Sequence, residues 1–233
     1  MIFRQLFELQ SSAYTYLIGC EDSHEAALID PVLETVDRDL SLIAELGLTL
    51  KYTIETHIHA DHVTGASRLR ERTRCKCALP EKSGADRVDV PVREAEPIRL
   101  GRLELKPLYT PGHTDDHYSY LLEAGGAPRV FTGDALLIDG CGRTDFQNGD
   151  AATLYRSVHD KIFSLPGDTL VYPGHDYQQR HVSTVAQERE RNPRLGGGRS
   201  LDEFVEIMAG LNLPRPKKMD VAVPANRVCG QVH

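Results

Sequence analysis

The stretch THIHADH, residues 56–62, follows directly on the apolar run that ends in YTIE. Within six residues it contains three histidines and one aspartate, namely His57, His59, Asp61 and His62. Imidazoles and carboxylates are common metal ligands in proteins, and a cluster of this density in one loop indicates a bound ligand. His57 and His59 are two residues apart, so in extended backbone both imidazoles would point to the same side. The stretch therefore predicts a chelating loop at the end of a strand.

Three later apolar runs end in the same way, in a tight turn that carries one possible ligand. LKPLYT leads into a turn with His113, RVFT into one with Asp134, and TLVY into one with His175. In sheets covered by helices, functional groups collect at the carboxyl ends of strands, where loops converge. We therefore expect the four turns to share one metal-binding pocket. The residues predicted to lie in it are His57, His59, Asp61, His62, His113, Asp134 and His175.

Other residues with ligand chemistry are assigned simpler roles. Asp30 ends the run AALID, and whether it orients a histidine or has only a structural role is left open. The five cysteines are scattered and form no CxxC pair, so we expect reduced thiols, with Cys75 and Cys77 at alternate positions of a short strand. The remaining histidines are expected to be ordinary hydrogen-bonded residues: His24, His117, His159, His181 and His233.

Length and composition limit the class of protein. With 233 residues, 40% of them hydrophobic, the chain can bury one sizeable core, and we expect a single domain spanning residues 1–233. The net charge of -7 argues against binding to nucleic acid, which requires clustered Lys and Arg. No apolar stretch approaches the ~18 residues that cross a bilayer, so no membrane span is expected. The first residues, MIFRQLFELQ, lack the features of a signal peptide, and a cytoplasmic location is the default expectation.

Hydrophobic periodicity predicts strands that occur both consecutively and in alternation with helices. The predicted strands are residues 2–9, 14–19, 26–30, 51–56, 102–109, 118–123, 128–132 and 168–173, and the predicted helices are residues 35–45, 64–74, 152–165 and 200–211. The class is therefore α/β or α+β, with sheets covered by helices. The stretch NPRLGGGR, residues 192–199, has the composition of a flexible connection.

THIHADH, together with GHT, GD and PGH, resembles the metallo-β-lactamase superfamily over about residues 14–177. This resemblance implies an α/β fold, the αββα four-layer sandwich, with a metal site at one edge. The seven predicted pocket residues would then fill two adjacent metal sites, as in the hydrolases of that superfamily. A two-zinc hydrolase is the first hypothesis.

A second resemblance covers nearly the whole chain. The stretches that carry it are GDALLIDGCGRTDFQNGD (133–150), LYRSVHDKIFSLPGDTLVYPGHDY (154–177), STVAQERERNPRL (183–195) and NLPRPKKMDVAVPAN (212–226). They resemble the persulfide dioxygenases, the sulfur dioxygenase family of the ethylmalonic encephalopathy protein. In that family one ferrous iron per subunit is held by two histidines and one aspartate, which fall on His57, His113 and Asp134 here. The resemblance places His59, Asp61, His62 and His175 around the iron and not on it.

The same resemblance implies the reaction and the partners. Glutathione persulfide would be oxidised with O₂ and water to sulfite and glutathione, in a chain that forms a homodimer. Two imidazoles and one carboxylate leave positions on Fe(II) open for a persulfide sulfur and O₂. Zinc could not support this reaction, because it has no accessible redox change.

Two residues near the ligand turns are candidates for substrate binding. Arg143, in CGRTDF, would pair with a glutathione carboxylate, although an ion pair with Asp145 is the alternative. Tyr177 follows the turn of His175 and would reach the same pocket. We expect Asp176 to be a turn residue, and Cys141 is not needed as a nucleophile in a metal mechanism.

Two other functions stay open. A glyoxalase II-like hydrolase of a glutathione thioester, with two zinc ions, is the first alternative. Those enzymes usually have Gly-His in place of Asp116 and His117, and they use a long basic helical extension that the segment NLPRPKKMDVAVPAN does not resemble. A metal-binding sensor without catalysis is the second, and it would need neither open metal positions nor an arginine anchor.

Overall fold

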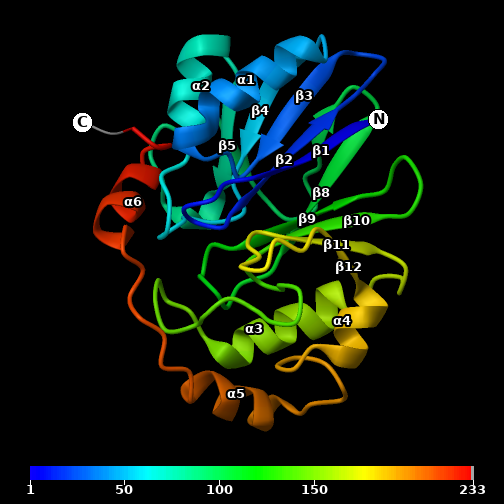
Figure 1. Ribbon diagram of the computed structural model, residues 1–233, viewed down its shortest axis with the longest axis vertical. Coiled ribbons are helices and arrows are strands. Elements are labelled where there is room, and N and C mark those ends of the chain that lie inside the picture. Colours follow the sequence, from blue (N-terminus) through cyan, green and yellow to red (C-terminus); the bar gives the residue numbers. More distant parts are fainter. Residues whose placement is uncertain (232–233) are drawn as a thin grey trace.

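Two mixed six-stranded sheets pack face to face in the computed structural model, which describes residues 1–231 (Figure 1). Helices cover the outer face of each sheet, so the layers follow the order αββα. This arrangement confirms the predicted four-layer α/β sandwich. His233, expected to be an ordinary histidine, lies outside the described residues.

The first sheet has the strand order β1-β2-β3-β4-β5-β6. Its strands are β1 (Ile2–Phe7), β2 (Tyr14–Gly19), β3 (Glu25–Ile29), β4 (Thr49–Ile54), β5 (Lys76–Pro80) and β6 (Val90–Val92). The first three strands pair antiparallel, and β3 to β6 pair parallel. The parallel crossovers carry α1 (Val36–Glu45) and α2 (Ala66–Thr73), which pack on the outer face.

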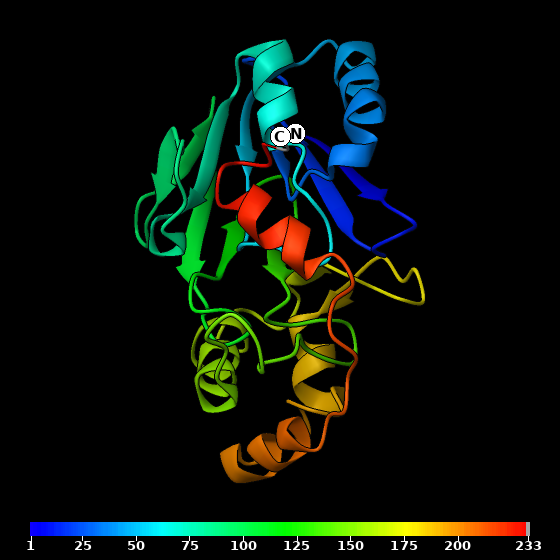
Figure 2. The same cartoon turned by 90° about the vertical axis from the view of Figure 1, so that its left-hand side faces the viewer.

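The second sheet has the strand order β12-β11-β10-β9-β8-β7. Its strands are β7 (Ile98–Leu100), β8 (Leu103–Tyr109), β9 (Tyr118–Leu122), β10 (Arg129–Gly133), β11 (Leu170–Pro173) and β12 (Ser183–Thr184). Only β10 and β11 pair parallel. Its outer face is covered by α3 (Ala151–Ser157), which continues as a π-helical turn over Val158–Ile162, and by α4 (Val185–Arg191). The helix α5 (Leu201–Ala209) packs against α3. The last helix, α6 (Met219–Asn226), lies beside the first sheet below α2 (Figures 1 and 2).

Alternating side chains of β2 show how the layers are held together. Tyr16 faces the inner layer, where its ring lies 5.0 Å from that of Phe131 on β10, while the neighbouring Leu17 packs under α1. Burying aromatic side chains of this size supplies much of the stability of such a layer. The hydroxyl of Tyr16 donates to the carbonyl of Pro173 at 2.5 Å, so the buried polar end of the ring is paired and ties the two sheets together at β11.

Several short elements escaped the sequence-based prediction. The strands β6, β7 and β12 have two or three residues each, too few for a periodic pattern, and α4 and α6 are short helices in polar or proline-containing sequence. Cys77 lies in β5 and Cys75 directly precedes it, and all five cysteines are free, as expected. The prediction of a flexible connection at residues 192–199 was wrong, because Asn192 and Leu195 are buried there.

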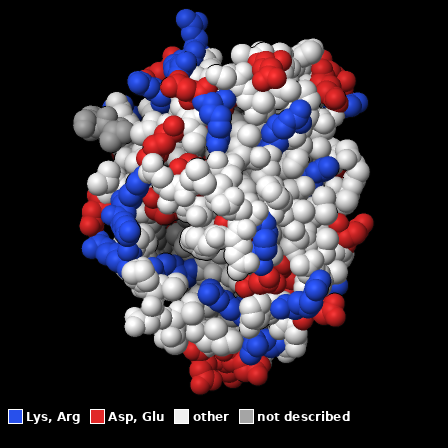
Figure 3. Space-filling view, in the orientation of Figure 1, with Lys and Arg blue, Asp and Glu red and all other residues white. Residues whose placement is uncertain are grey.

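A cavity of about 690 Å³ opens at one edge of the sandwich, beside the segment that joins α5 to α6. Figure 3 shows this hollow with Lys and Arg side chains gathered around it. The carboxyl ends of β4, β10 and β11 and the turn after β8 meet at this edge, so the four predicted ligand turns do converge. No helix among residues 1–231 is long and apolar enough to cross a membrane.

Candidate metal centre

The segment between β4 and α2, residues 55–65, forms no helix or strand, yet nearly all of it is buried. Its backbone groups therefore need partners from other parts of the chain. Ile58 illustrates this, because its N–H donates to Asp116 Oδ2 at 3.0 Å and its carbonyl accepts from Gln147 Nε2 at 2.6 Å. Both partners are far away in sequence. The loop that carries His57 to His62 is thus fixed from outside.

His57 is oriented by a relay that starts at Asp30. The carboxylate of Asp30 accepts the Thr56 N–H at 2.7 Å and the Thr56 hydroxyl at 2.9 Å. Because that hydroxyl has only one proton to give, its oxygen accepts from His57 Nδ1, 2.9 Å away. The pKa of His57 is well below its usual value, first because the ring is buried and then because other histidines surround it. His57 is therefore neutral, with the lone pair on Nε2, and the role of Asp30 left open above is an orienting one.

His113 is held in the same tautomer by the main chain. Its Nδ1 lies 2.7 Å from the carbonyl oxygen of Arg143, which can only accept a hydrogen bond, so Nδ1 carries the proton. Nε2 is therefore the ring nitrogen that can bind a metal ion, and it lies 3.6 Å from Asp134 Oδ2. Donor atoms of His57, His113 and Asp134 all lie within 4.8 Å of one another. The three residues form one potential binding site for a metal ion.

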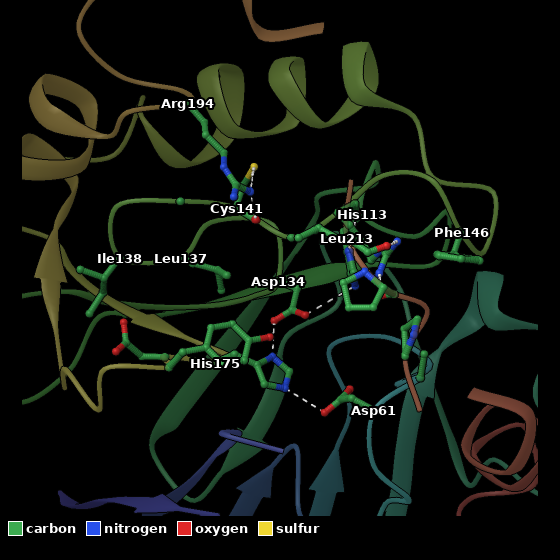
Figure 4. Close-up of a pocket in the computed structure, with 18 of the residues that line it drawn as sticks. Asp61, His113, Asp134, Leu137, Ile138, Cys141, Phe146, His175, Arg194 and Leu213 are labelled. Atoms are coloured by element: carbon green, nitrogen blue, oxygen red, sulfur yellow. Dashed lines mark hydrogen bonds and ion pairs between the residues drawn. The ribbon is translucent and has the colours of Figure 1, made fainter. Parts of the chain in front are cut away.

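His175 lies between two carboxylates (Figure 4). Its Nδ1 is 2.7 Å from Asp134 Oδ1, and its Nε2 is 2.9 Å from Asp61 Oδ2. Burial opposes a charge on the ring, but the two acids outweigh burial and raise the pKa of His175 well above its usual value. Burial likewise opposes ionisation of Asp134, but the pKa of Asp134 is lowered by His175 and then by His113. The contacts from Asp61 through His175 to Asp134 therefore hold the ionised carboxylate of Asp134 in place.

His117, expected to be an ordinary hydrogen-bonded residue, is a direct neighbour of the site. Its Nε2 accepts the backbone N–H of Asp134 at 3.1 Å, and Nδ1 lies 3.0 Å from the Thr110 hydroxyl. Burial lowers the pKa of His117 to about 3, so the ring is a neutral acceptor. A Cβ on Gly133 would lie 2.5 Å from Nε2, and glycine at φ 48° permits this approach.

His59 and His62 form a second group with Asp61. His59 Nε2 is 3.1 Å from Asp30 Oδ1, and His62 Nδ1 is 2.9 Å from Asp61 Oδ2. The other ring nitrogens, His59 Nδ1 and His62 Nε2, are buried and have no hydrogen-bond partner in the described part of the chain. Donor atoms of these three residues also lie within 4.8 Å of one another. Two sets of possible ligands therefore lie side by side.

The cavity of about 690 Å³ opens onto Asp134 and His175 and has a mixed lining. Its apolar wall is formed by Leu137, Ile138, Phe146 and Leu213, and its basic residues are Arg143, Arg180, Arg194, Arg215 and Lys217. Tyr177 lies at the mouth with 77% of its surface exposed. Cys141 also lines the cavity, but burial raises the pKa of its thiol to about 11, which fits the expectation that it is no nucleophile.

Arg143 forms the ion pair that was the alternative to substrate binding. Its guanidinium donates to Asp145 at 2.6 and 2.8 Å, and also to the carbonyls of Pro214 at 2.6 Å and Leu213 at 3.2 Å. Arg143 therefore ties the segment between α5 and α6 to the cavity wall. Asp176 is a turn residue, as expected, since its Oδ1 accepts the backbone N–H groups of Gln178 and Arg180.

Comparison with known proteins places the chain in a family of known fold. The sequence model of the metallo-beta-lactamase superfamily matches residues 10–175. The mitochondrial persulfide dioxygenase ETHE1 of Mus musculus is 52% identical over 231 residues, which covers 99% of this chain and 89% of that protein. The crystal structure of ETHE1 from Myxococcus xanthus superposes with a TM-score of 0.95 at 57% identity, covering 99% of this chain and 100% of that one. A hydroxyacylglutathione hydrolase of Hahella chejuensis is more distant, with 38% identity over 67% of this chain and 59% of its own length.

Replacing Thr56 by valine tests the relay from Asp30 to His57. Thr56→Val keeps the shape of the side chain but removes the hydroxyl that orients His57 Nδ1. Loss of such an outer partner lowers metal affinity roughly 10- to 100-fold. We expect that loss in a titration with Fe²⁺ under anaerobic conditions, with the fold retained by circular dichroism.

Thr53→Val is the matched control. Thr53 lies three residues earlier on β4, is equally buried, and its hydroxyl has no hydrogen-bond partner within residues 1–231. We expect this variant to bind metal like the unaltered chain. Equal affinities in the two variants would show that the hydroxyl of Thr56 does not act on His57.

Proposed function

Because this chain belongs to the metallo-beta-lactamase superfamily and, within it, to the persulfide dioxygenases, we propose that it oxidises glutathione persulfide with O₂ at one ferrous iron per chain. The proposed ligands are His57, His113 and Asp134. The products are sulfite and glutathione. Both atoms of O₂ end on the outer sulfur, and water supplies the third oxygen of sulfite as the S–S bond breaks and the glutathione thiol takes up a proton.

The observation that carries this proposal is the donor set. The hydrogen bonds at Nδ1 leave Nε2 of His57 and of His113 as the nitrogens that can bind a metal ion. Asp134 is an ionised carboxylate, and donor atoms of the three residues lie within 4.8 Å of one another. Two imidazoles and one carboxylate are the ligands of non-haem ferrous oxygenases, so the residues present fit the metal. Bound there, ferrous iron would supply the redox chemistry with O₂ that no side chain offers.

The other residues of the site hold this set in place. His175 and Asp61 orient the carboxylate of Asp134 from one side, and the N–H of Asp134 is held by His117 from the other. In this arrangement Asp61, His62 and His175 are hydrogen-bonded to carboxylates or to one another. That pairing supports their proposed place around a single metal ion.

The cavity supports the choice of an anionic peptide-like substrate. Glutathione carries two carboxylates, and Arg215 and Lys217 line the cavity together with an apolar wall. A persulfide end that reaches Asp134 would place the charged ends of glutathione toward the basic mouth. Arg143 then contributes to substrate binding in two ways. Its positive charge attracts a carboxylate, and its hydrogen bonds hold the cavity-lining segment at Leu213 and Pro214 in place.

A two-zinc hydrolase of glutathione thioesters is the second candidate. The buried His59 Nδ1 and His62 Nε2, which have no hydrogen-bond partner among residues 1–231, favour it, because a second metal ion would satisfy both. The similarity to a hydroxyacylglutathione hydrolase is consistent with it, but this similarity is weaker than that to the persulfide dioxygenases.

The cytoplasmic location, the single domain and the homodimer stay predictions, and the matching mouse protein is named as mitochondrial.

Metal content and turnover together separate these functions. We expect the purified chain to contain about one iron, to consume O₂ with glutathione persulfide and to release sulfite. Two zinc ions per chain with O₂-independent cleavage of S-lactoylglutathione would overturn the proposal in favour of the hydrolase. A fully metallated protein that turns over neither substrate would overturn it in favour of a metal sensor.

Arg143→Ala tests the substrate side of the site. We expect KM for glutathione persulfide to rise roughly tenfold, because hydrogen bonds to a charged group contribute about 1.5–3 kcal/mol. The iron content should stay the same, since only the backbone of Arg143 contacts His113. Arg99→Ala is the control, as Arg99 is exposed and pairs with Glu104 outside the cavity. A KM equal to that of the control variant would remove Arg143 from the substrate site.

A further inference from the structure

The C-terminal helix α6 reaches the metal-binding loop through its last residue, Asn226, which is only 2% exposed. Its Nδ2 donates to the carbonyls of His59 and His62, both at 2.9 Å, and its Oδ1 accepts the N–H of Thr64 at 2.9 Å. Both amide protons and the amide oxygen are thus used on one short loop, more than 160 residues away in sequence. Three contacts of this kind fix the loop and the orientation of the amide together.

Neighbouring contacts seat α6 against the same part of the chain. Ala222 and Ala225 pack with Val63 in a small apolar cluster. The carbonyl of Cys229 accepts the N–H of Ser67 at 2.8 Å, at the start of α2. Gly230 approaches so closely that a Cβ would lie 2.2 Å from the Thr64 oxygen. The placement of Asn226 is therefore determined by packing on both sides of it.

The backbone groups that Asn226 contacts lie between His59 and Thr64, and this part of the loop contains His59, Asp61 and His62. Asp61 contacts His175, and His175 contacts Asp134, the proposed anionic ligand. A shift of the loop backbone would move Asp61 away from His175 and release Asp134. Asn226 is thus connected to the ligand set by its hydrogen bonds to the loop, by the loop backbone as far as Asp61, and by the hydrogen bonds from Asp61 through His175 to Asp134.

We propose that Asn226 is a positioning residue of the metal centre and that α6 is a functional part of that centre. The inference rests on the proposed function only in that the site binds a metal ion. Asn226 touches neither the ligand set nor the cavity lining. It acts by satisfying three backbone groups of a loop that forms no helix or strand.

Metal affinity of two Asn226 variants tests this role. Asn226→Ala removes all three contacts, whereas Asn226→Asp keeps the shape and the acceptor for Thr64 but turns both donors into acceptors that face carbonyl oxygens. We expect at least tenfold weaker binding of Fe²⁺ and of Co²⁺ in both variants. The visible absorption spectrum of bound Co²⁺ should also change, because it reports the ligand geometry directly.

Asn192→Ala is the matched control. Asn192 is also 2% exposed and its side chain also bridges backbone groups, including the Gly140 carbonyl at 3.0 Å and the Leu195 N–H at 3.1 Å. It contacts no residue of the metal-binding loop. We expect a similar loss of Tm in the metal-free protein, but Co²⁺ affinity within about twofold of the unaltered chain. Asn226→Ser, which keeps a hydroxyl, replaces the alanine variant if that variant does not fold.

The outcomes separate this inference from the proposed function. Unaltered Co²⁺ affinity and spectrum in both Asn226 variants, with Tm lowered as in Asn192→Ala, would show a purely structural role and overturn the inference alone. Failure of the unaltered chain to bind Fe²⁺ or Co²⁺ would overturn the proposed function and the inference together. Weaker binding and a changed spectrum only in the Asn226 variants would support the inference.

Discussion

A buried loop with no helix or strand of its own has to find partners for its backbone polar groups elsewhere, because unpaired groups of this kind cost about 1–3 kcal/mol each. Residues 55–65 are such a loop. Five side chains meet this need, and they come from distant parts of the chain: Asp30, Asp116, Tyr120, Gln147 and Asn226. The chelating histidines are therefore held by protein contacts that involve both sheets and the C-terminal helix.

The charges of the site follow from the same buried network. Rings next to hydroxyls, carbonyls or other histidines, such as His57 and His117, stay neutral and can offer a lone pair. Rings next to carboxylates, such as His59 and His175, gain a proton because the acids outweigh burial. Neutral and charged imidazoles thus lie within one site, and the neutral ones include His57, one of the two proposed histidine ligands.

The sequence was most informative where function depends on local pattern. The runs before THIHADH, His113, Asp134 and His175 predicted strand ends, and these ends do meet at one edge. His117 and Asn226 could not be assigned in this way, because their roles depend on the register of β8 with β9 and on where the chain end packs. Arg143 shows the limit clearly: its residue type suits a substrate carboxylate and Asp145 equally, and only the structure shows the ion pair.

We propose that one redox-active ion lies between His57, His113 and Asp134. Anomalous diffraction from crystals of protein purified without added metal, measured at the iron and zinc absorption edges, tests it most directly. A single iron peak among these three residues is expected. A second peak of equal height among His59, Asp61 and His62, with both peaks at the zinc edge, would contradict a single-iron site.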